Sequence, residues 1–116
     1  MHIEAIKTHR IEVNESINTL LDKHIQTLSD GDIIAISSKI ISLCQNRVIH
    51  KSKIDKNNLI QQEADLILDA GHNPYDVKIT LKDGVLIPSA GIDESNAGDF
   101  YILYPKNTQA VAASIW

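Results

Sequence analysis

The sequence contains one cysteine and few aromatic residues, and both shortages exclude classes of protein. Cys44 has no second cysteine to pair with, so the chain is not a disulfide-stabilised scaffold, and we expect a small buried hydrophobe here. The five histidines show none of the spacings typical of zinc ligands: His2, His9, His24, His50 and His72. Only one tryptophan, one phenylalanine and three tyrosines occur, too few for a surface that stacks nucleic-acid bases.

Long apolar runs and the common nucleotide motifs are also missing. No run approaches the roughly 18 residues of a membrane span, and no basic-then-apolar leader opens the chain, so a cytoplasmic location without membrane partners is expected. A net charge of -4 argues against a nucleic-acid partner. The sequence lacks the GxxxxGK[ST], GxGxxG and GxSxG patterns. What remains is an ordinary composition, 43% hydrophobic and 22% charged over 116 residues, which predicts one ordered domain, 1–116.

Charge is distributed unevenly. Residues 39–56 hold five basic side chains and one acidic one, whereas residues 57–105 hold two basic and eight acidic ones. The middle of the chain is therefore suited to an anion and the later part to a cation. A solvated loop explains His50, Lys51 and Lys53 equally well.

Hydrophobic patterning predicts strands and one helix in the first half of the chain. Residues 2–7 alternate as in a short strand, and Asn14 or Ser16 can cap a helix whose apolar stripe runs to Leu28. The β-branched run at 32–36 indicates a buried strand, and residues 47–49 indicate another.

The second half gives stronger signals. Asp55 is a plausible cap for a helix that ends near Gly71, and alternation over residues 77–88 around Asp83-Gly84 predicts a β-hairpin. A loop at 89–98, a strand at 100–104 and a helix from Asn107 or Thr108 follow. That last helix has no C-terminal cap and looks cut rather than finished. Together these elements predict a mixed α+β (α/β) domain with a mixed sheet and three main helices.

Two segments stand out as candidate sites. Ser37, Ser38 and Lys39 follow the strand predicted at 32–36, where hydroxyls and an ammonium can hold phosphate oxygens, although a surface edge explains them too. In the 89–96 loop, the carboxylate of Asp93 suits a hard divalent cation, and Asn96 supplies an amide. The competing interpretation of this loop is a set of turn-forming residues.

The 89–96 loop, Ser-Ala-Gly-Ile-Asp-Glu-Ser-Asn, resembles the "NAGID-SN" signature of the coenzyme F420-0:L-glutamate ligase family, also called γ-glutamyl ligases. Residues 31–34 and 38–42 are similar to that family's "GD-x-hydrophobic" and "SKIVS" stretches. Residues 6–11 fit its first strand and turn, and Arg47-Val48 falls where it has a glycine-arginine pair. The resemblance covers nearly the whole chain.

The resemblance implies a function and a set of site residues. Family members transfer phosphate from GTP to a carboxylate of a deazaflavin cofactor precursor, and the amine of L-glutamate then displaces the phosphate to form an amide. Carried over, Asp93 would bind magnesium or manganese, and the nucleotide would contact Thr8, His9, Arg10, Ile11, Ser38, Lys39 and Asn96. No catalytic residue is assigned by this route, and a homodimer is implied.

Several positions depart from the family pattern. Ser89 stands where asparagine is common, Leu43 stands where many members have a second nucleotide-contacting lysine, and Cys44-Gln45-Asn46 replaces Ala-Glu-Gly. Family members are also longer, with a C-terminal half that supplies further ligands and is absent here. We therefore expect the N-terminal part of a ligase that is inactive alone. The alternatives are a non-catalytic nucleotide-binding or assembly module, or an amide ligase for a different carboxylate.

Overall fold

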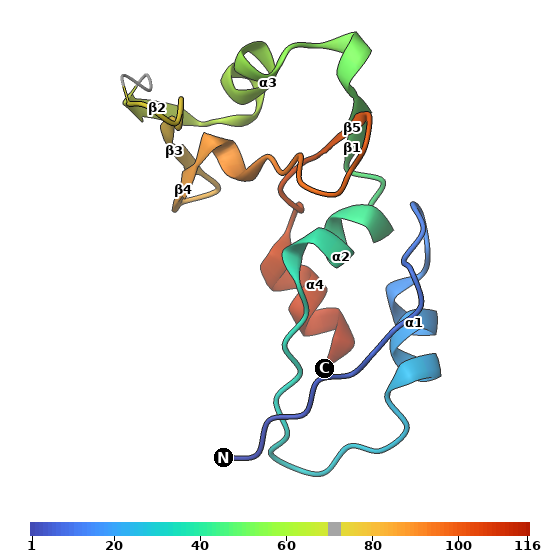
Figure 1. The fold of residues 1–116 in the computed structure, drawn as a ribbon. Helices are drawn as coiled ribbons and strands as arrows, with labels where there is room; N and C mark the ends of the chain where they lie inside the picture. Colours follow the sequence, from blue (N-terminus) through green and yellow to red (C-terminus); the bar gives the residue numbers. More distant parts are fainter. Residues whose placement is uncertain (70–72) are drawn as a thin grey trace. The chain divides into compact units, whose positions relative to one another are not determined.

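The computed structural model describes residues 1–69 and 73–116 (Figure 1). Contacts between residues divide the chain into two compact units. The terminal unit consists of Met1–Asn46 and Pro105–Trp116, and the central unit of Arg47–Tyr104. Each unit is described separately below.

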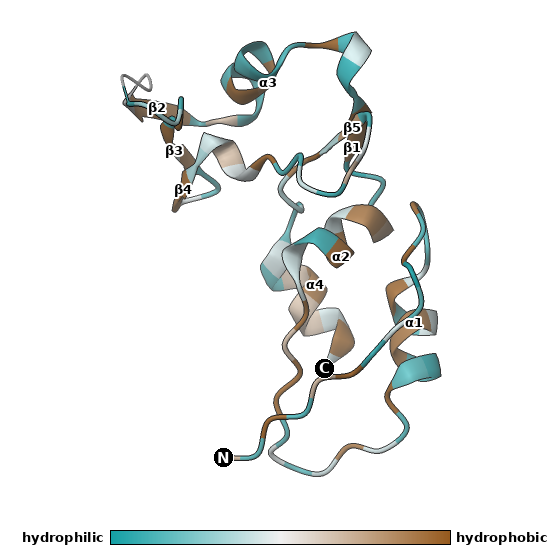
Figure 2. Cartoon of the chain, in the orientation of Figure 1, coloured by the Kyte–Doolittle hydropathy of each residue, from teal (hydrophilic) through white to brown (hydrophobic). Residues whose placement is uncertain are grey.

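The terminal unit contains three helices: α1 (Ile17–His24), α2 (Ser38–Cys44) and α4 (Thr108–Ile115). Helix α1 begins as the sequence predicts, because the Ser16 hydroxyl accepts a hydrogen bond from the Thr19 amide at 3.3 Å. Its last turn carries Lys23 and His24, which suit the negative end of the helix dipole. Figure 2 shows this hydrophilic last turn below the more hydrophobic body of α1.

Three predictions for the terminal unit are wrong. Neither residues 2–7 nor residues 32–36 form strands, and α1 ends at His24 rather than running to Leu28. The side chains of Ile3 and Ile33 are 79% and 93% exposed. An isolated apolar run does not form a strand without a neighbour to accept its backbone hydrogen bonds, and this unit, all of which is described, contains no strand. Ser38 and Lys39 therefore begin helix α2 instead of following a strand.

The end of α2 is tied to the start of α4 by one side-chain amide. Gln45 donates from Nε2 to the Lys106 carbonyl and accepts from the Lys106 amide at Oε1, both at 2.8 Å. The next residue, Asn46, has a φ of 55°, and asparagine is among the few residues other than glycine that adopt this left-handed conformation readily. Two of the departures from the family pattern, Gln45 and Asn46, thus have local structural roles.

The central unit contains two small antiparallel sheets. Strand β1 (Val48–His50) pairs with β5 (Phe100–Ile102), with His50 opposite Phe100. The second sheet has the order β2 (Leu66–Asp69), β3 (Ile79–Lys82) and β4 (Val85–Pro88). The hairpin between β3 and β4 confirms the prediction for 77–88, and Asp83 and Gly84 both have positive φ, 50° and 75°, as a type I′ turn requires.

Helix α3 (Lys56–Glu63) begins where the sequence predicts but ends earlier. The Asp55 carboxylate accepts from the Asn58 amide at 3.1 Å and so caps the helix. At Ala64 the backbone becomes extended, and Ile67 belongs to β2, where it lies opposite Thr80. The predicted end at Gly71 lies outside the described residues. Pairing with the hairpin, which the local pattern does not encode, replaces the last turns of the predicted helix.

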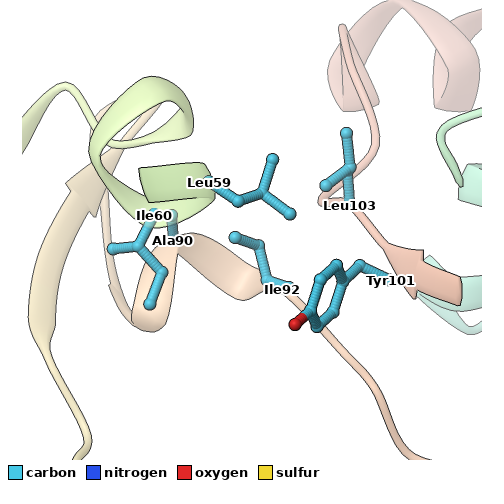
Figure 3. Packing of buried hydrophobic residues seen from close by; sticks show 6 residues of the cluster. All are labelled: Leu59, Ile60, Ala90, Ile92, Tyr101 and Leu103. Atoms are coloured by element: carbon cyan, nitrogen blue, oxygen red, sulfur yellow. The ribbon is translucent and has the colours of Figure 1, made fainter. Parts of the chain in front are cut away.

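The mixed α+β class is confirmed: the described residues form four α-helices and two small sheets. Helices α1, α3 and α4 correspond to the three expected, α2 is additional, and every described strand pair is antiparallel. The core of the central unit packs α3 against residues 90–92 and 101–103 (Figure 3). Its buried members are Leu59, Ile60, Ala90, Ile92, Tyr101 and Leu103.

One partly buried ion cluster joins α3 to both sheets. The Glu63 carboxylate is 2.5 Å from Arg47 Nη2 and 3.3 Å from Lys82 Nζ, and Arg47 Nε donates to the Tyr104 carbonyl at 3.1 Å. Burial alone would raise the pKa of Glu63, but the hydrogen bond and charge of Arg47, together with Lys82, outweigh it and lower the pKa.

The lowered pKa of Glu63 predicts acid sensitivity of the central unit. Since the folded state binds the proton more weakly than the unfolded chain, the cluster stabilises the fold above about pH 4.5 and loses this effect as the pH falls through the folded pKa. Glu63→Gln should cost about 1–3 kcal/mol at pH 7 and flatten the dependence of urea unfolding on pH between 7 and 3. Glu4→Gln, at an exposed position, is the control; equal pH profiles for Glu63→Gln and the wild type would refute this role.

Candidate nucleotide and metal site

The 89–96 loop begins with three consecutive residues in left-handed conformations. After Pro88 ends β4, Ser89, Ala90 and Gly91 have φ values of 48°, 54° and 71° and form the short 3-10 helix η2 (Ser89–Gly91). The turn is held from inside, because the Ala90 amide donates to Thr80 Oγ1 at 2.7 Å and this hydroxyl donates to the Ile87 carbonyl. Thr80 and Ala90 are fully buried. Backbone strain of this kind persists only where surrounding contacts enforce it.

The small residues of the loop serve the chain's own packing. A Cβ atom at Gly91 would lie 2.8 Å from Cδ2 of Tyr104 and 2.9 Å from Cδ1 of Ile87, closer than real contacts allow. Ala90 is completely buried among Leu59, Ile60 and the other core residues (Figure 3). Ala90 and Gly91 are therefore small because their positions face neighbouring side chains of the same unit.

Asp93 follows directly and is fixed through both its backbone and its side chain. Its amide and carbonyl pair with Ile102 in an isolated antiparallel bridge, each hydrogen bond being 2.8 Å long. Its Oδ1 atom accepts from the Ser95 amide at 2.7 Å and from the Ser95 hydroxyl at 2.6 Å. The turn-forming interpretation is therefore confirmed, and the same contacts orient a carboxylate as the second shell of a metal site does.

The other polar residues of the loop have separate roles. Glu94 forms an ion pair with Lys56 at 2.6 Å, and this hydrogen bond and charge, aided by Lys51, lower the pKa of Glu94. Asn96 is exposed and left-handed, with a φ of 57°. The carbonyl of Asp99 accepts from the Lys51 amide at 2.8 Å, which closes the loop against the segment after β1.

The donor set around Asp93 suits one kind of metal binding. Among the described residues, no group of three or more histidine, cysteine, aspartate or glutamate side chains can enclose a metal ion. An enclosed zinc or calcium site would need such a group. Magnesium instead commonly binds one or two carboxylates together with water and substrate phosphates, a mode that a single oriented carboxylate such as Asp93 fits.

The basic segment after β1 forms η1 (Lys51–Lys53), a short 3-10 helix. Together with α3 it borders a shallow polar hollow of about 680 Å³, lined in part by Lys51, Lys53, Asn58 and Gln61. Lys51 also places its Nζ 5.5 Å from the centre of the Tyr101 ring. Sequence patterning singled out these lysines but gave no reason to expect the amide-lined wall opposite them.

The 8–11 segment (Thr8, His9, Arg10 and Ile11) lies in the terminal unit and has no regular secondary structure. The Thr8 hydroxyl donates to the His9 carbonyl at 3.0 Å, and Arg10 is exposed while Ile11 is half-buried. The His9 ring is held by two side chains, Glu15 and His24. Sequence reasoning missed these partners, because positions 9, 15 and 24 have no periodic relation.

Ser38 and Lys39 also lie in the terminal unit, in the first turn of α2. Ser38 is exposed and lines an apolar cavity of about 700 Å³, to which α2, α4 and residues 28–36 contribute. Ile41 and Val111 are among its other lining residues. Its volume lies in the range of small-molecule pockets.

The structure thus places the candidate residues in two groups. Residues 8–11, Ser38 and Lys39 belong to the terminal unit, and Asp93 and Asn96 belong to the central unit. In the described part of the chain, no helix is both long and apolar enough to cross a membrane.

A comparison with protein families assigns the chain to a class. Residues 5–116 match the model of a ligase family, so the match includes both units and every candidate residue. The family is F420-0:gamma-glutamyl ligase, and the chain belongs to it. The resemblance drawn from the 89–96 loop and the segments before it is thereby confirmed, and ligase chemistry in coenzyme F420 biosynthesis is the family's activity.

Proposed function

We propose that this chain takes part in GTP-dependent γ-glutamyl ligation, joining L-glutamate to a carboxylate of a deazaflavin cofactor precursor. The observation that carries the proposal is the fixed carboxylate of Asp93, in the loop that resembles the family signature and within the residues that match the family. Bound there, magnesium or manganese would neutralise charge on the phosphates of the nucleotide.

The reaction balances in two steps. A carboxylate oxygen of the precursor attacks the γ-phosphorus of GTP, which gives an acyl phosphate and GDP; the glutamate amine then attacks the acyl carbon and releases inorganic phosphate and a proton. Phosphoryl transfer of this kind depends on positioning and charge neutralisation rather than on a protein nucleophile. In the terminal unit, Lys39 supplies positive charge, Ser38 and Thr8 supply hydroxyls, and Arg10 supplies further donors.

The side chains of the terminal unit support nucleotide binding in particular. Ser38 borders a cavity of suitable volume, and Arg10 is exposed in the 8–11 segment. Arginine and lysine beside hydroxyl groups form a common set of phosphate ligands. His9, whose ring nitrogens are engaged within the chain, and Ile11 would then contribute through their backbone.

Because this part of the ligase is expected to be inactive alone, the test is ligation by the full-length protein that contains it, with GTP, L-glutamate, manganese chloride and the F420-0 precursor. Release of GDP and formation of a product one glutamate heavier, both dependent on all four components, are expected. GTP binding without GDP release would instead favour the non-catalytic nucleotide-binding module. GDP release with other carboxylates but not with this precursor would indicate an amide ligase of different substrate.

A further inference from the structure

Three side chains of the terminal unit form a continuous hydrogen-bonded chain that the family assignment does not explain. His9 Nε2 lies 2.6 Å from Glu15 Oε1, and His9 Nδ1 lies 2.9 Å from His24 Nε2. The two rings are tilted by 32° with centroids 5.1 Å apart. Both His9 and Glu15 are partly buried, with side-chain exposures of 34% and 20%. The 8–11 segment, which has no regular secondary structure, is thus held through the His9 ring by two side chains, Glu15 and His24.

Glu15 is itself fixed. Its Oε2 accepts from the Glu12 amide at 3.0 Å, and the Glu15 amide donates to the Glu12 carbonyl at 3.3 Å. The hydrogen bond from the Glu12 backbone is the largest influence that lowers the pKa of Glu15, and His9 and Lys23 lower it further. Glu15 precedes the cap of α1, and His24 ends α1, so both anchors of His9 belong to one helix and its approach.

The chemistry of the groups sets the direction of each hydrogen bond. An ionised carboxylate only accepts hydrogen bonds. His9 must therefore carry its hydrogen on Nε2 and donate this hydrogen bond to Glu15. Neutral His9 then accepts at Nδ1, and His24 Nε2 must donate.

We propose that Glu15 and His24 are positioning residues that hold the 8–11 segment, through the His9 ring, in its nucleotide-binding arrangement. The inference rests on the proposed function, since it assigns this segment to GTP. The charged or titratable groups that act on the cluster besides its own members are Lys23, on α1, and Cys44, at the end of α2; burial and the charge of Glu15 raise the pKa of that thiol.

The test compares variants that break the chain with variants that preserve it. His24→Ala and Glu15→Ala remove a partner, whereas His24→Gln keeps a donor and Glu15→Gln keeps an acceptor for His9. Affinity for GTP should fall about tenfold in the alanine variants, the equivalent of one hydrogen bond, and remain near the wild-type value in the glutamine variants. His2→Ala, at an exposed position, is the control.

A second readout does not need GTP. Nitrogen-15 spectra of the imidazoles should show His9 protonated at Nε2 and unprotonated at Nδ1 at pH 8, and His24→Ala should shift the amide signals of residues 8–11 while His2→Ala leaves them unchanged. Unaltered signals, or GTP affinity equal to the wild type in His24→Ala, would overturn the proposal. If the expected spectra are seen but the wild type does not bind GTP, the clamp exists and its nucleotide role is refuted together with the proposed function.

Discussion

Replacing Gly91 by alanine should destabilise the central unit by about 2–5 kcal/mol, from two causes that add. A left-handed backbone costs a residue with a Cβ atom roughly 1–2 kcal/mol, and forcing an atom into a filled space costs a further 1–3 kcal/mol or so. At Gly91 both apply, since φ is +71° and the new Cβ would meet the Tyr104 and Ile87 side chains. Urea unfolding measured by circular dichroism gives the difference in free energy.

Gly98 offers a matched control within the same unit. Its φ is +57°, but no atom lies within 4 Å of the position a Cβ would take. Gly98→Ala should therefore carry the backbone cost alone, about 1–2 kcal/mol. If the two alanine variants were equally stable, backbone conformation alone would explain the glycine at position 91. The packing described around Tyr104 would then be wrong.

Replacing Asp93 by alanine should reduce metal-dependent GTP turnover at least about 100-fold, because the proposed ion would lose its protein ligand. The variant should remain folded, since the backbone of Asp93 is held by Ile102 rather than by its own side chain. Asp93→Asn is the sharper test. It retains an oxygen that can accept from Ser95 and so keeps the turn, while removing the negative charge. GDP release is measured against manganese concentration.

Ser95→Ala separates orientation from ligation. It leaves the carboxylate in place but removes the hydroxyl that donates to Oδ1 at 2.6 Å. Loss of an orienting partner typically costs 10- to 100-fold in metal affinity, so a higher manganese requirement with a similar maximal rate is expected, roughly tenfold. Unchanged turnover in Asp93→Ala and Asp93→Asn would remove Asp93 from the metal site.

Local sequence signals predict the structure correctly where the interaction itself is local. Ser16 and Asp55 cap their helices through residues three positions away, and Asp83-Gly84 forms its turn within one hairpin. The errors arise where distant partners decide. The run at 32–36 has the composition of a buried strand but no strand beside it in its unit, and Ile67 follows the helical period yet pairs with Thr80.

The candidate site shows the same division. The 89–96 loop is recognisable from its amino-acid sequence. Its turn is also predictable, because the hydrogen bond between Asp93 and Ser95 joins residues only two positions apart. The support beneath it was not foreseen, since Thr80 lies ten positions before the Ala90 amide that it accepts from. The contacts of His9 with Glu15 and His24 are not predictable from the sequence for a similar reason. Glu15 lies just before α1 and His24 at its end, so the two come together around His9 only once the helix has formed.

The buried hydroxyl of Thr80 links the hairpin to the Asp93 loop in a further way. It accepts a hydrogen bond from the Ala90 amide and donates one to the carbonyl of Ile87 on β4. One oxygen atom thus links the hairpin to the start of the loop. Any fluctuation that separates β3 from β4 must also release the start of the loop. The Ala90 amide proton should consequently exchange with deuterium at the rate of hairpin opening. Its exchange rate would therefore report how often Asp93, the proposed metal ligand, leaves its position.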